Sequence, residues 1–370
     1  MDSILKQLAN KEAFDAFIQD NMALSTYTPL WKQEIPDSEV EYSATGNFST
    51  YTAEYEAAAI ASVIAKNADK PLKNMPTLGQ LTGSIARMGD RFQLDNDRLR
   101  DLMIMEDRFR NTSANFTETK RLSEWGKITD FLFKPYQSAA IAPHKRLDLL
   151  YFEGLSNGTL TVDLNNNPQG IAFDPIDFGV KKFGASGPVW STATAGTMTA
   201  LQDIRRIVDI LETQYGKIVT QLRMSPATFS KMQLSNQFNQ SVKLNLSSME
   251  VGPAGMLSLE MANKYLGGLD LPPIKLERKM IRINDTQTIN AFKDDRVVFQ
   301  CAPNVAKMVI SDPLELRMPH PNKQYSDYFD NLISQYRKEE GQFIEYEMWG
   351  LPVFSGKEDF AIMEVDRTEA

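Results

Sequence analysis

The side chains that most often perform catalysis are scarce in this sequence. Two histidines, His144 and His320, and one cysteine, Cys301, occur in 370 residues. Zinc sites and Cys/His nucleophilic catalysis need several such side chains close together. Cys301 ends the strand-like run 296–301, where a small buried side chain is the simpler interpretation. His320 lies between two prolines and is interpreted as a loop residue.

Other catalytic patterns are also missing. The sequence has no glycine-rich phosphate-binding motif and no GxSxG nucleophile turn. Adjacent carboxylates do occur, but in polar turns or charged stretches, where a solvated surface is the better interpretation: Asp294-Asp295, Glu339-Glu340 and Glu358-Asp359. We therefore predict no catalytic residue, no cofactor, no metal ligand and no enzymatic activity. A hydrolase that uses a carboxylate pair is kept as an alternative.

One segment, 163–174, has oxygen-bearing side chains at a spacing that suits calcium. Counted as a loop, it places Asp or Asn at positions 1, 3, 5 and 12. Position 6, however, is Pro168, where a calcium-binding EF-hand needs glycine. The preceding residues also alternate as a strand does, so we interpret the segment as an asparagine-rich turn.

Composition and charge exclude several classes of protein. The chain is 42% hydrophobic and 24% charged, which is ordinary for one large or two modest domains. The net charge of −8 argues against a dedicated nucleic-acid binder. No run of about 18 apolar residues predicts a membrane span, and the N-terminal residues do not predict a secretory signal. The single cysteine fits a reducing cytoplasm.

The charge is unevenly distributed along the chain. Residues 61–100 contain seven Lys or Arg against four Asp or Glu, whereas residues 310–370 contain six against thirteen. Opposite patches on one chain favour head-to-tail self-association. We expect the basic segment with Lys66, Lys70 and Lys73 to contact an acidic neighbouring subunit.

The first 45 residues are predicted to form an extended arm. Pro29 and Pro36 interrupt regular structure there. Several aromatic side chains of the arm need a surface to cover them: Phe14, Phe17, Tyr27 and Trp31. That surface is either the subunit's own domain or a neighbouring subunit, and we expect the neighbouring subunit to supply it. After the arm, residues 55–65 and 81–94 are predicted to pair as a long two-stranded excursion that cannot bury both faces alone.

The rest of the chain alternates between helix and strand signals. Residues 97–156 are mostly helical in pattern, although Pro135 and Pro143 are expected to break or kink the helix. An amphipathic helix is predicted to begin at Thr199 with a capping box to Gln202, and to end at Gly216.

Further signals follow this helix. Ser225-Pro226 predicts the start of a second helix, and residues around 257–266 predict a third. Strands are predicted at 217–222, 296–301, 351–354 and 359–365.

This order of elements resembles that of the major capsid proteins of tailed bacteriophages, the Hong Kong 97-type fold, and among them the protein E branch. The resemblance rests on Trp190 with the helix 199–211, on the helix–strand–Ser-Pro-x-Thr-Phe stretch 216–229, on 147–154, and on the closing strands 350–353 and 360–365. It implies an α+β fold with four parts: an N-terminal arm (1–45), an extended β-hairpin or E-loop (46–96), a peripheral domain with a spine helix (97–184 and 286–370), and an axial domain (185–285).

The same resemblance implies a structural role. Copies of the chain would form hexamers and pentamers of an icosahedral shell that encloses phage double-stranded DNA without sequence specificity. Scaffold, portal and decoration proteins are the implied partners, with no cofactor and no membrane. The implied location is the virion capsid, after assembly in the host cytoplasm. The alternatives are an encapsulin-like compartment, a phage tail or adhesion protein, and the hydrolase named above.

Overall fold

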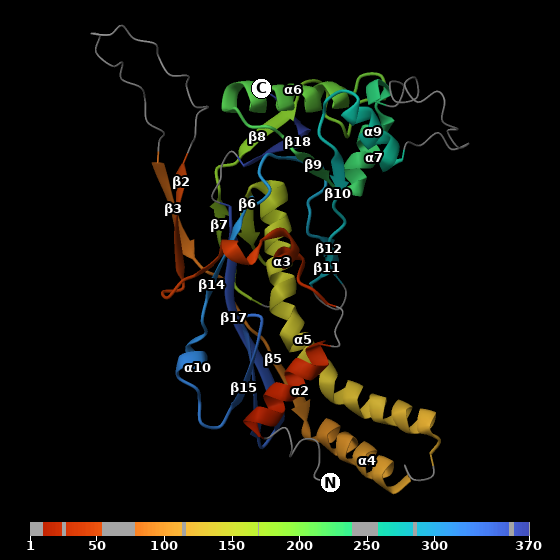
Figure 1. Ribbon diagram of the computed structural model, residues 1–370, viewed down its shortest axis with the longest axis vertical. Coiled ribbons are helices and arrows are strands. Elements are labelled where there is room, and N and C mark those ends of the chain that lie inside the picture. The colour runs from red at the N-terminus through yellow and green to blue at the C-terminus, as the bar shows by residue number, and fades with distance from the viewer. Residues whose placement is uncertain are drawn as a thin grey trace. The chain divides into compact units, whose positions relative to one another are not determined.

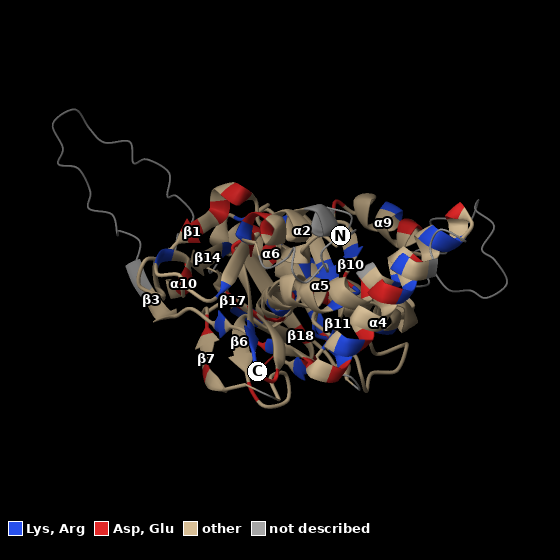
Figure 2. Cartoon of the chain, turned by 90° about the horizontal axis from the view of Figure 1, so that it is seen from below, with Lys and Arg blue, Asp and Glu red and all other residues tan. Residues whose placement is uncertain are grey.

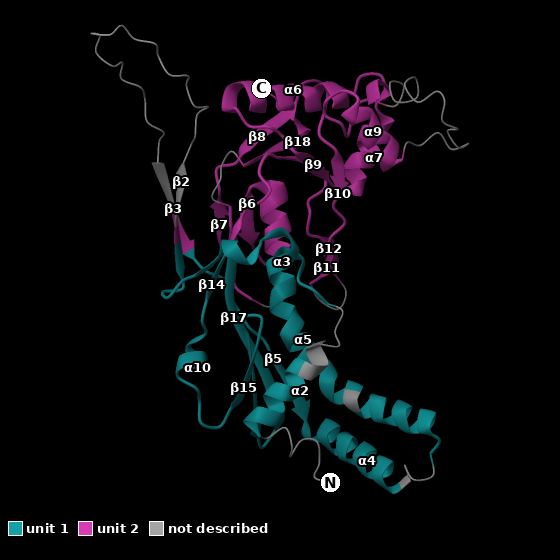
Figure 3. Cartoon of the chain, viewed as in Figure 1, with its two compact units in different colours: residues 1–48, 84–148, 308–351 teal, residues 49–83, 149–307, 352–370 magenta. Residues whose placement is uncertain are grey.

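The computed structural model describes residues 10–23, 27–53, 78–112, 116–168, 170–238, 258–283, 287–354 and 359–369. The chain divides into two compact units (Figure 3). Unit 1 comprises residues 1–48, 84–148 and 308–351, and unit 2 comprises 49–83, 149–307 and 352–370. These divisions differ from the domain boundaries predicted from the sequence, because strands near the C-terminus belong to both units.

Unit 1 is built on a seven-stranded sheet. Its main path runs β1-β14-β17-β16-β15, and β4 and β5 also pair with β17. The strands are β1 (Val40–Tyr42), β4 (Arg87–Met88), β5 (Arg91–Asp95), β14 (Lys307–Ser311), β15 (Gln324–Tyr328), β16 (Asn331–Lys338) and β17 (Gly341–Val353). The thirteen-residue β17 is the organising strand, because four other strands pair with it: β4, β5, β14 and β16.

A tight turn joins β15 to β16. Phe329 and Asp330 have φ values of 51° and 63°, both in the left-handed region. Two consecutive residues with positive φ are the requirement of a type I′ hairpin turn, whose twist matches that of the flanking strands. The turn thereby sets the register in which Tyr328 faces Asn331.

The helices of unit 1 are α2 (Lys11–Ala23), α3 (Leu30–Glu34), α4 (Asn96–Thr112), α10 (Leu314–Arg317) and most of α5 (Glu118–Asn157). The prediction that Pro135 and Pro143 could break the helical stretch is wrong, because both lie inside the 40-residue α5. Figure 1 shows that α5 bends instead, between an orange-yellow first part and a yellow-green second part. Prolines remove one helical hydrogen bond each and commonly kink a helix in this way.

A distant side chain compensates one of these prolines. Pro143 has no N–H, so it cannot donate to the carbonyl group of Ala139, four residues earlier. The buried Asn331 donates its Nδ2 to that carbonyl oxygen at 3.0 Å, and to the oxygen of Ala140 at 3.2 Å. The helix continues through Pro143 because β16 supplies the missing donor.

Unit 2 contains a five-stranded sheet in the order β10-β9-β13-β18-β8. Its strands are β8 (Lys181–Ala185), β9 (Gln221–Met224), β10 (Ile274–Leu276), β13 (Arg296–Gln300) and β18 (Phe360–Thr368). The central strands are apolar and completely buried, as at Val297, Phe299 and Ile362. This is the pattern of a sheet covered on both faces.

Three helices pack with this sheet: α6 (Ala200–Tyr215), α7 (Pro226–Leu234) and α9 (Leu259–Gly267). Their starts and stops agree with several local signals. The Ser225 hydroxyl accepts a hydrogen bond from the N–H of Thr228, which confirms the predicted start of α7. Gly216 ends α6 with φ 62°, as predicted.

The capping box predicted for α6 is wrong. Thr199 does occupy the N-cap position, but its side chain accepts no hydrogen bond from the first turn. Its hydroxyl group lies 3.0 Å from a carboxylate oxygen of Asp203 and donates to it. The Thr199 hydroxyl thus serves the buried, charged acceptor of Asp203.

Three strand pairs lie outside the two large sheets: β2 (Asn47–Ala53) with β3 (Leu78–Ser84), β6 (Thr159–Val162) with β7 (Phe173–Asp177), and β11 (Met280–Arg282) with β12 (Thr288–Asn290). The first pair is two-stranded, as the predicted excursion is, and β3 shares residues 81–84 with the predicted return strand. The predicted outward strand, 55–65, lies outside the residues that the structure describes. Residues 91–95 belong instead to β5, which pairs with β17. Among the helices that the structure describes, none is long and apolar enough to cross a membrane.

Candidate functional site

The predicted arm contains a helix whose apolar face packs within unit 1. Phe14 and Ile18, one turn apart on α2, are both 0% exposed. The ring of Phe14 lies 5.7 Å from that of Tyr136 on α5. The half-buried Phe17 contacts the same tyrosine and Phe133 edge-on. The expectation that Phe14 needs a neighbouring subunit to bury it is therefore wrong.

A second set of contacts joins Trp31 of α3, and Tyr27 before it, to α5. Trp31 is 0% exposed, and its backbone N–H donates to Oδ1 of the buried Asp148 at 2.7 Å. Its indole N–H donates to Nδ1 of His144 at 3.4 Å, and the two rings stack. Tyr27 donates its hydroxyl to the other oxygen of Asp148. Trp31 too is covered by its own chain, which corrects the prediction made for it.

These contacts change the pKa values of two groups. Burial, with a smaller contribution from Lys32, lowers the pKa of His144 to about 4. Burial and the neighbouring Asp148 carboxylate raise the pKa of the Tyr27 phenol. Both groups are therefore neutral at pH 7, which suits an aromatic cluster that excludes water.

The structure does not decide whether the other predicted interface residues contact a neighbouring subunit. Phe17 and Tyr27 keep part of their surface exposed and remain predicted interface residues. Lys66, Lys70 and Lys73 lie outside the residues that the structure describes.

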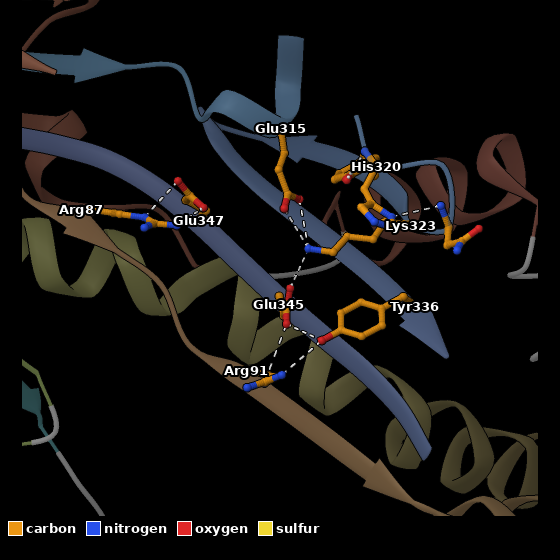
Figure 4. A network of polar contacts seen from close by, with 10 residues as sticks. Arg87, Arg91, Glu315, His320, Lys323, Tyr336, Glu345 and Glu347 are labelled. Atoms are coloured by element: carbon orange, nitrogen blue, oxygen red, sulfur yellow. Dashed lines mark hydrogen bonds and ion pairs between the residues drawn. The ribbon is translucent and has the colours of Figure 1, made fainter. Parts of the chain in front are cut away.

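The most connected group of charged side chains lies on the sheet of unit 1 (Figure 4). Lys323 donates to both carboxylate oxygens of Glu315, at 2.9 and 3.2 Å, and to Oε2 of Glu345 at 2.9 Å. The other oxygen of Glu345 accepts the hydroxyl group of Tyr336 at 2.5 Å. Arg91 donates to that tyrosine oxygen at 3.3 Å.

The pKa shifts in this network are those of a structural ion pair. Burial opposes the charged form of Glu345, but hydrogen bonds from Tyr336 and Lys323 outweigh it and lower its pKa. For Lys323, burial acts to lower the pKa, but its bonds to Glu315 and Glu345 raise it overall. General acid–base catalysis needs a group whose pKa lies near the working pH. Both shifts lead away from that condition.

One carboxylate pair in unit 2 has a different character. Asp295, one of the adjacent acids noted in the sequence, hydrogen-bonds to Asp366 and forms an ion pair with Lys231. Desolvation and the nearby Asp366 raise the pKa of Asp295. The backbone N–H of Asp295 also donates to the Thr228 hydroxyl, so the group links β13, β18 and α7. These contacts join separate elements of unit 2 and indicate a structural role for Asp295.

The asparagine-rich segment 163–174 forms a self-contained turn. Oδ1 of Asp163 accepts hydrogen bonds from the backbone N–H groups of Asn165 and Asn166, at 2.9 and 3.0 Å. The side chain of Asn166 in turn accepts the N–H of Asp163. These are the bonds of an Asx turn, in which the carboxylate is satisfied by its own loop. No group of three or more His, Cys, Asp or Glu in the described part of the chain could hold a metal ion.

The remaining candidate nucleophile is also unreactive. Burial raises the pKa of the Cys301 thiol to about 11, so it is not a thiolate at neutral pH. His320 accepts a hydrogen bond from the N–H of Asn322 within its own loop. Neither side chain is in a catalytic arrangement.

One group of buried hydrogen bonds, centred on Asp203, was not predicted from the sequence. The carboxylate of Asp203 is 0% exposed and accepts four hydrogen bonds. The donors are the N–H and hydroxyl of Ser186, the indole N–H of Trp190 and the hydroxyl of Thr199. A signal was present, because Asp203 lies one turn before Ile207 on the apolar stripe of α6, where a charge needs buried partners.

Comparison with known proteins identifies the fold. No family model matches the sequence, and no curated protein matches it. The structure is similar to that of a protein assigned as the capsid protein of a prophage in Escherichia coli CFT073, with a TM-score of 0.55 over 96% of this chain and 98% of that one, at 14% identity. The chain has a phage capsid-protein fold. This confirms the α+β Hong Kong 97-type fold class predicted from the sequence.

Two further structures resemble the chain more distantly. The capsid of cyanophage A-1(L) has a TM-score of 0.45 and 9% identity, covering 92% of this chain and 93% of that one. A phage-related protein from Bordetella bronchiseptica RB50 has a TM-score of 0.43 and 10% identity, covering 95% and 96%. The likeness that shows the fold is the one to the prophage protein, which covers 96% of this chain.

Proposed function

We propose that this chain is a major capsid protein. Copies of it assemble into hexamers and pentamers of a closed icosahedral shell around phage double-stranded DNA. The observation that carries the proposal is the likeness to the prophage capsid protein, which extends over nearly the full length of both chains. The proposal makes the protein structural, without catalytic residues, located in the virion capsid after assembly in the host cytoplasm.

The proposed parts of the subunit keep their predicted roles. The excursion at 46–96 extends toward a neighbouring subunit, and α5 is the spine helix. The peripheral and axial domains are 97–184 with 286–370, and 185–285. Scaffold, portal and decoration proteins are proposed partners, and contacts to packaged DNA are independent of base sequence.

The side-chain chemistry of the described residues supports a structural role. The ion pair of Lys323 with Glu345 joins the residue before β15 to β17, two strands away in the sheet. The buried Asp203 and Asn331 satisfy side-chain and backbone groups of other parts of the chain. These polar groups are used in holding the subunit together. A shell subunit needs such rigidity because its interfaces must keep one geometry over many copies.

Electron microscopy of the purified protein tests the proposal. The full-length chain, with a co-expressed scaffold where one is needed, is expected to form closed particles or rings that sediment far faster than a single subunit. A monodisperse monomer under every assembly condition would contradict it.

A charge-reversal variant tests the predicted basic contact. Changing Lys66, Lys70 and Lys73 to Glu is expected to lower particle yield most at low salt, because exposed charges are screened over about 8–10 Å at ordinary ionic strength. Changing Lys11, Lys120 and Lys134 to Glu alters the net charge equally and serves as the control. Equal yields for both variants would show that the basic segment makes no specific contact.

A further inference from the structure

Within unit 2, a short basic ribbon runs from β10 through β11. It consists of residues 275–282 and contains Lys275, Arg278, Lys279 and Arg282, against the single carboxylate Glu277. Figure 2 shows blue segments at β10 and β11. The whole chain has a net charge of −8, so a run of four cations in eight residues is a local reversal of its overall charge.

The one carboxylate of the ribbon is buried and already neutralised. Glu277 is 1% exposed, and its Oε1 lies 2.6 Å from Nη2 of Arg223, which is also 1% exposed. Nε of Arg223 donates to the same oxygen at 2.9 Å. Charges in a dry interior must be paired in this way. The buried pair therefore satisfies itself without help from the surface.

Two lysines add positive charge to this pair. Nζ of Lys275 and of Lys279 lie 3.3 and 3.5 Å from Glu277. Nζ of Lys279 and the guanidinium of Arg223 also lie over the ring of Phe152, at 5.0 and 5.9 Å from its centroid. Three cationic side chains thus lie around this one carboxylate.

The outer face of the ribbon carries the remaining cations. Arg278 and Arg282 are exposed, and so is Met280 between them, whereas Ile281 is buried. Alternate residues of a strand point to the same face, about 6–7 Å apart. The side chains of Met280 and Arg282 in β11 therefore share one face. The exposed Arg278 lies two residues before this strand, and the described residues 274–283 contain no exposed carboxylate.

The backbone of the ribbon is held in place by its neighbours. The N–H of Glu277 donates to the carbonyl oxygen of Met224 at 2.9 Å. The N–H of Lys279 donates to Oδ1 of Asn290, and its carbonyl oxygen accepts the N–H of Ala291. A fixed backbone lowers the entropy that a flexible basic loop would lose when it binds a ligand.

We propose that this basic ribbon is a contact surface for the phosphate backbone of double-stranded DNA. Four residues of extended chain span roughly 13 Å, a length over which a duplex carries about eight phosphates. Cations spaced along the chain can each meet a different phosphate of such a row, whereas an acidic side chain of another protein offers one charge at a point. The inference rests on the proposed function in taking DNA as the enclosed partner, and it names the residues that meet it.

Fluorescence anisotropy with a labelled 30-base-pair duplex of mixed sequence tests the ribbon. Full-length unassembled subunits are titrated at several salt concentrations. The variant Arg278→Glu with Arg282→Glu is expected to bind at least tenfold more weakly at low salt. The slope of log affinity against log salt is expected to fall by about 2, because each phosphate contact contributes about 0.9.

Two controls separate the ribbon from general charge effects. Arg205→Glu with Lys264→Glu makes the same change in net charge at exposed positions of unit 2 and is expected to leave the salt slope unchanged. Arg278→Lys with Arg282→Lys keeps the charge and is expected to retain binding. Equal losses for the two charge-reversal variants, or an unchanged slope for the first, would overturn the proposal.

Two further outcomes are decisive. Polyglutamate at equal charge concentration is expected to compete poorly with the duplex. If it competes equally, the ribbon binds acidic polypeptide and the proposal fails. If Arg278→Glu with Arg282→Glu binds DNA normally but forms no particles, the ribbon is an interface between copies, which also overturns it. Absence of particles from the wild-type chain would instead contradict the proposed shell function, since the anisotropy measurement is made on free subunits.

Discussion

Replacing Phe14 with alanine tests whether the N-terminal arm belongs to the core of its own subunit. The side chain is fully buried, and its ring packs 5.7 Å from that of Tyr136. Removing a buried phenylalanine side chain costs about 3–5 kcal/mol when the cavity cannot collapse. We take the lower figure, about 3 kcal/mol, as the expected loss.

Free subunits are the required sample, because a shell would protect the arm in any case. Urea unfolding at concentrations too low for assembly measures the free energy of unfolding. Limited proteolysis measures the opening of 11–23. A loss of about 3 kcal/mol in docking corresponds to cleavage roughly 100-fold faster, if opening and closing are rapid relative to cutting.

Phe17→Ala is the matched control, since the same helix and the same chemical change are involved. Phe17 is half-buried, and its ring meets those of Phe133 and Tyr136 edge-on. A smaller loss of about 1–2 kcal/mol is expected. The reasoning is refuted if the wild-type arm is cut as fast as an unfolded peptide and Phe14→Ala leaves stability unchanged. The arm would then be ordered by a neighbour, as the sequence alone predicted.

Three further predictions concern single side chains. Asp203→Asn is expected to lower the free energy of unfolding by roughly 2–4 kcal/mol, because buried donors lose a charged acceptor, whereas Asp209→Asn on the exposed face of α6 changes it little. Protonation of His144 is disfavoured in the folded state, where its pKa is about 4 instead of 6.5. The stability that depends on neutral His144, roughly 3 kcal/mol, is therefore fully present above pH 6.5 and is lost as the pH falls to 4. In the His144→Gln variant, the free energy of unfolding measured in urea is expected to change less with pH over that range. Arg87→Ala removes an exposed ion pair with Glu347 and is expected to cost less than about 1 kcal/mol in the same assay.

The local features predicted correctly depend on interactions within one turn. Ser225 caps α7 through an N–H only three residues away, and Gly216 ends α6 because glycine accepts positive φ. Strong apolar runs such as 296–300 are buried strands wherever they pair. The residue that caps or ends the helix lies within one turn of it, and a strongly apolar strand is buried whichever strand pairs with it.

The features predicted wrongly depend on partners far away in the sequence. A break at Pro143 was one of the two expected outcomes, but the helix continues because the missing hydrogen bond is replaced by Asn331, 192 residues from the carbonyl that it serves. Trp31 was expected to lack a partner within the chain, but Asp148 is 117 residues distant. Neither pairing leaves a pattern in one sequence, because any polar residue of suitable size could have served.

The net charge of the chain was also a weaker guide than it first appeared. A net charge of −8 argues against a dedicated nucleic-acid binder only if every charge of the chain contributes to the electrostatic potential at the ligand. At physiological salt, exposed charges farther away than about 8–10 Å are largely screened. A phosphate beside Arg278 and Arg282 therefore responds to the ribbon, and acidic residues elsewhere in the chain have little effect on it. Because each such contact is weak and free of sequence preference, many copies acting on one duplex hold it far more tightly than a free subunit does, and an assembled shell supplies those copies.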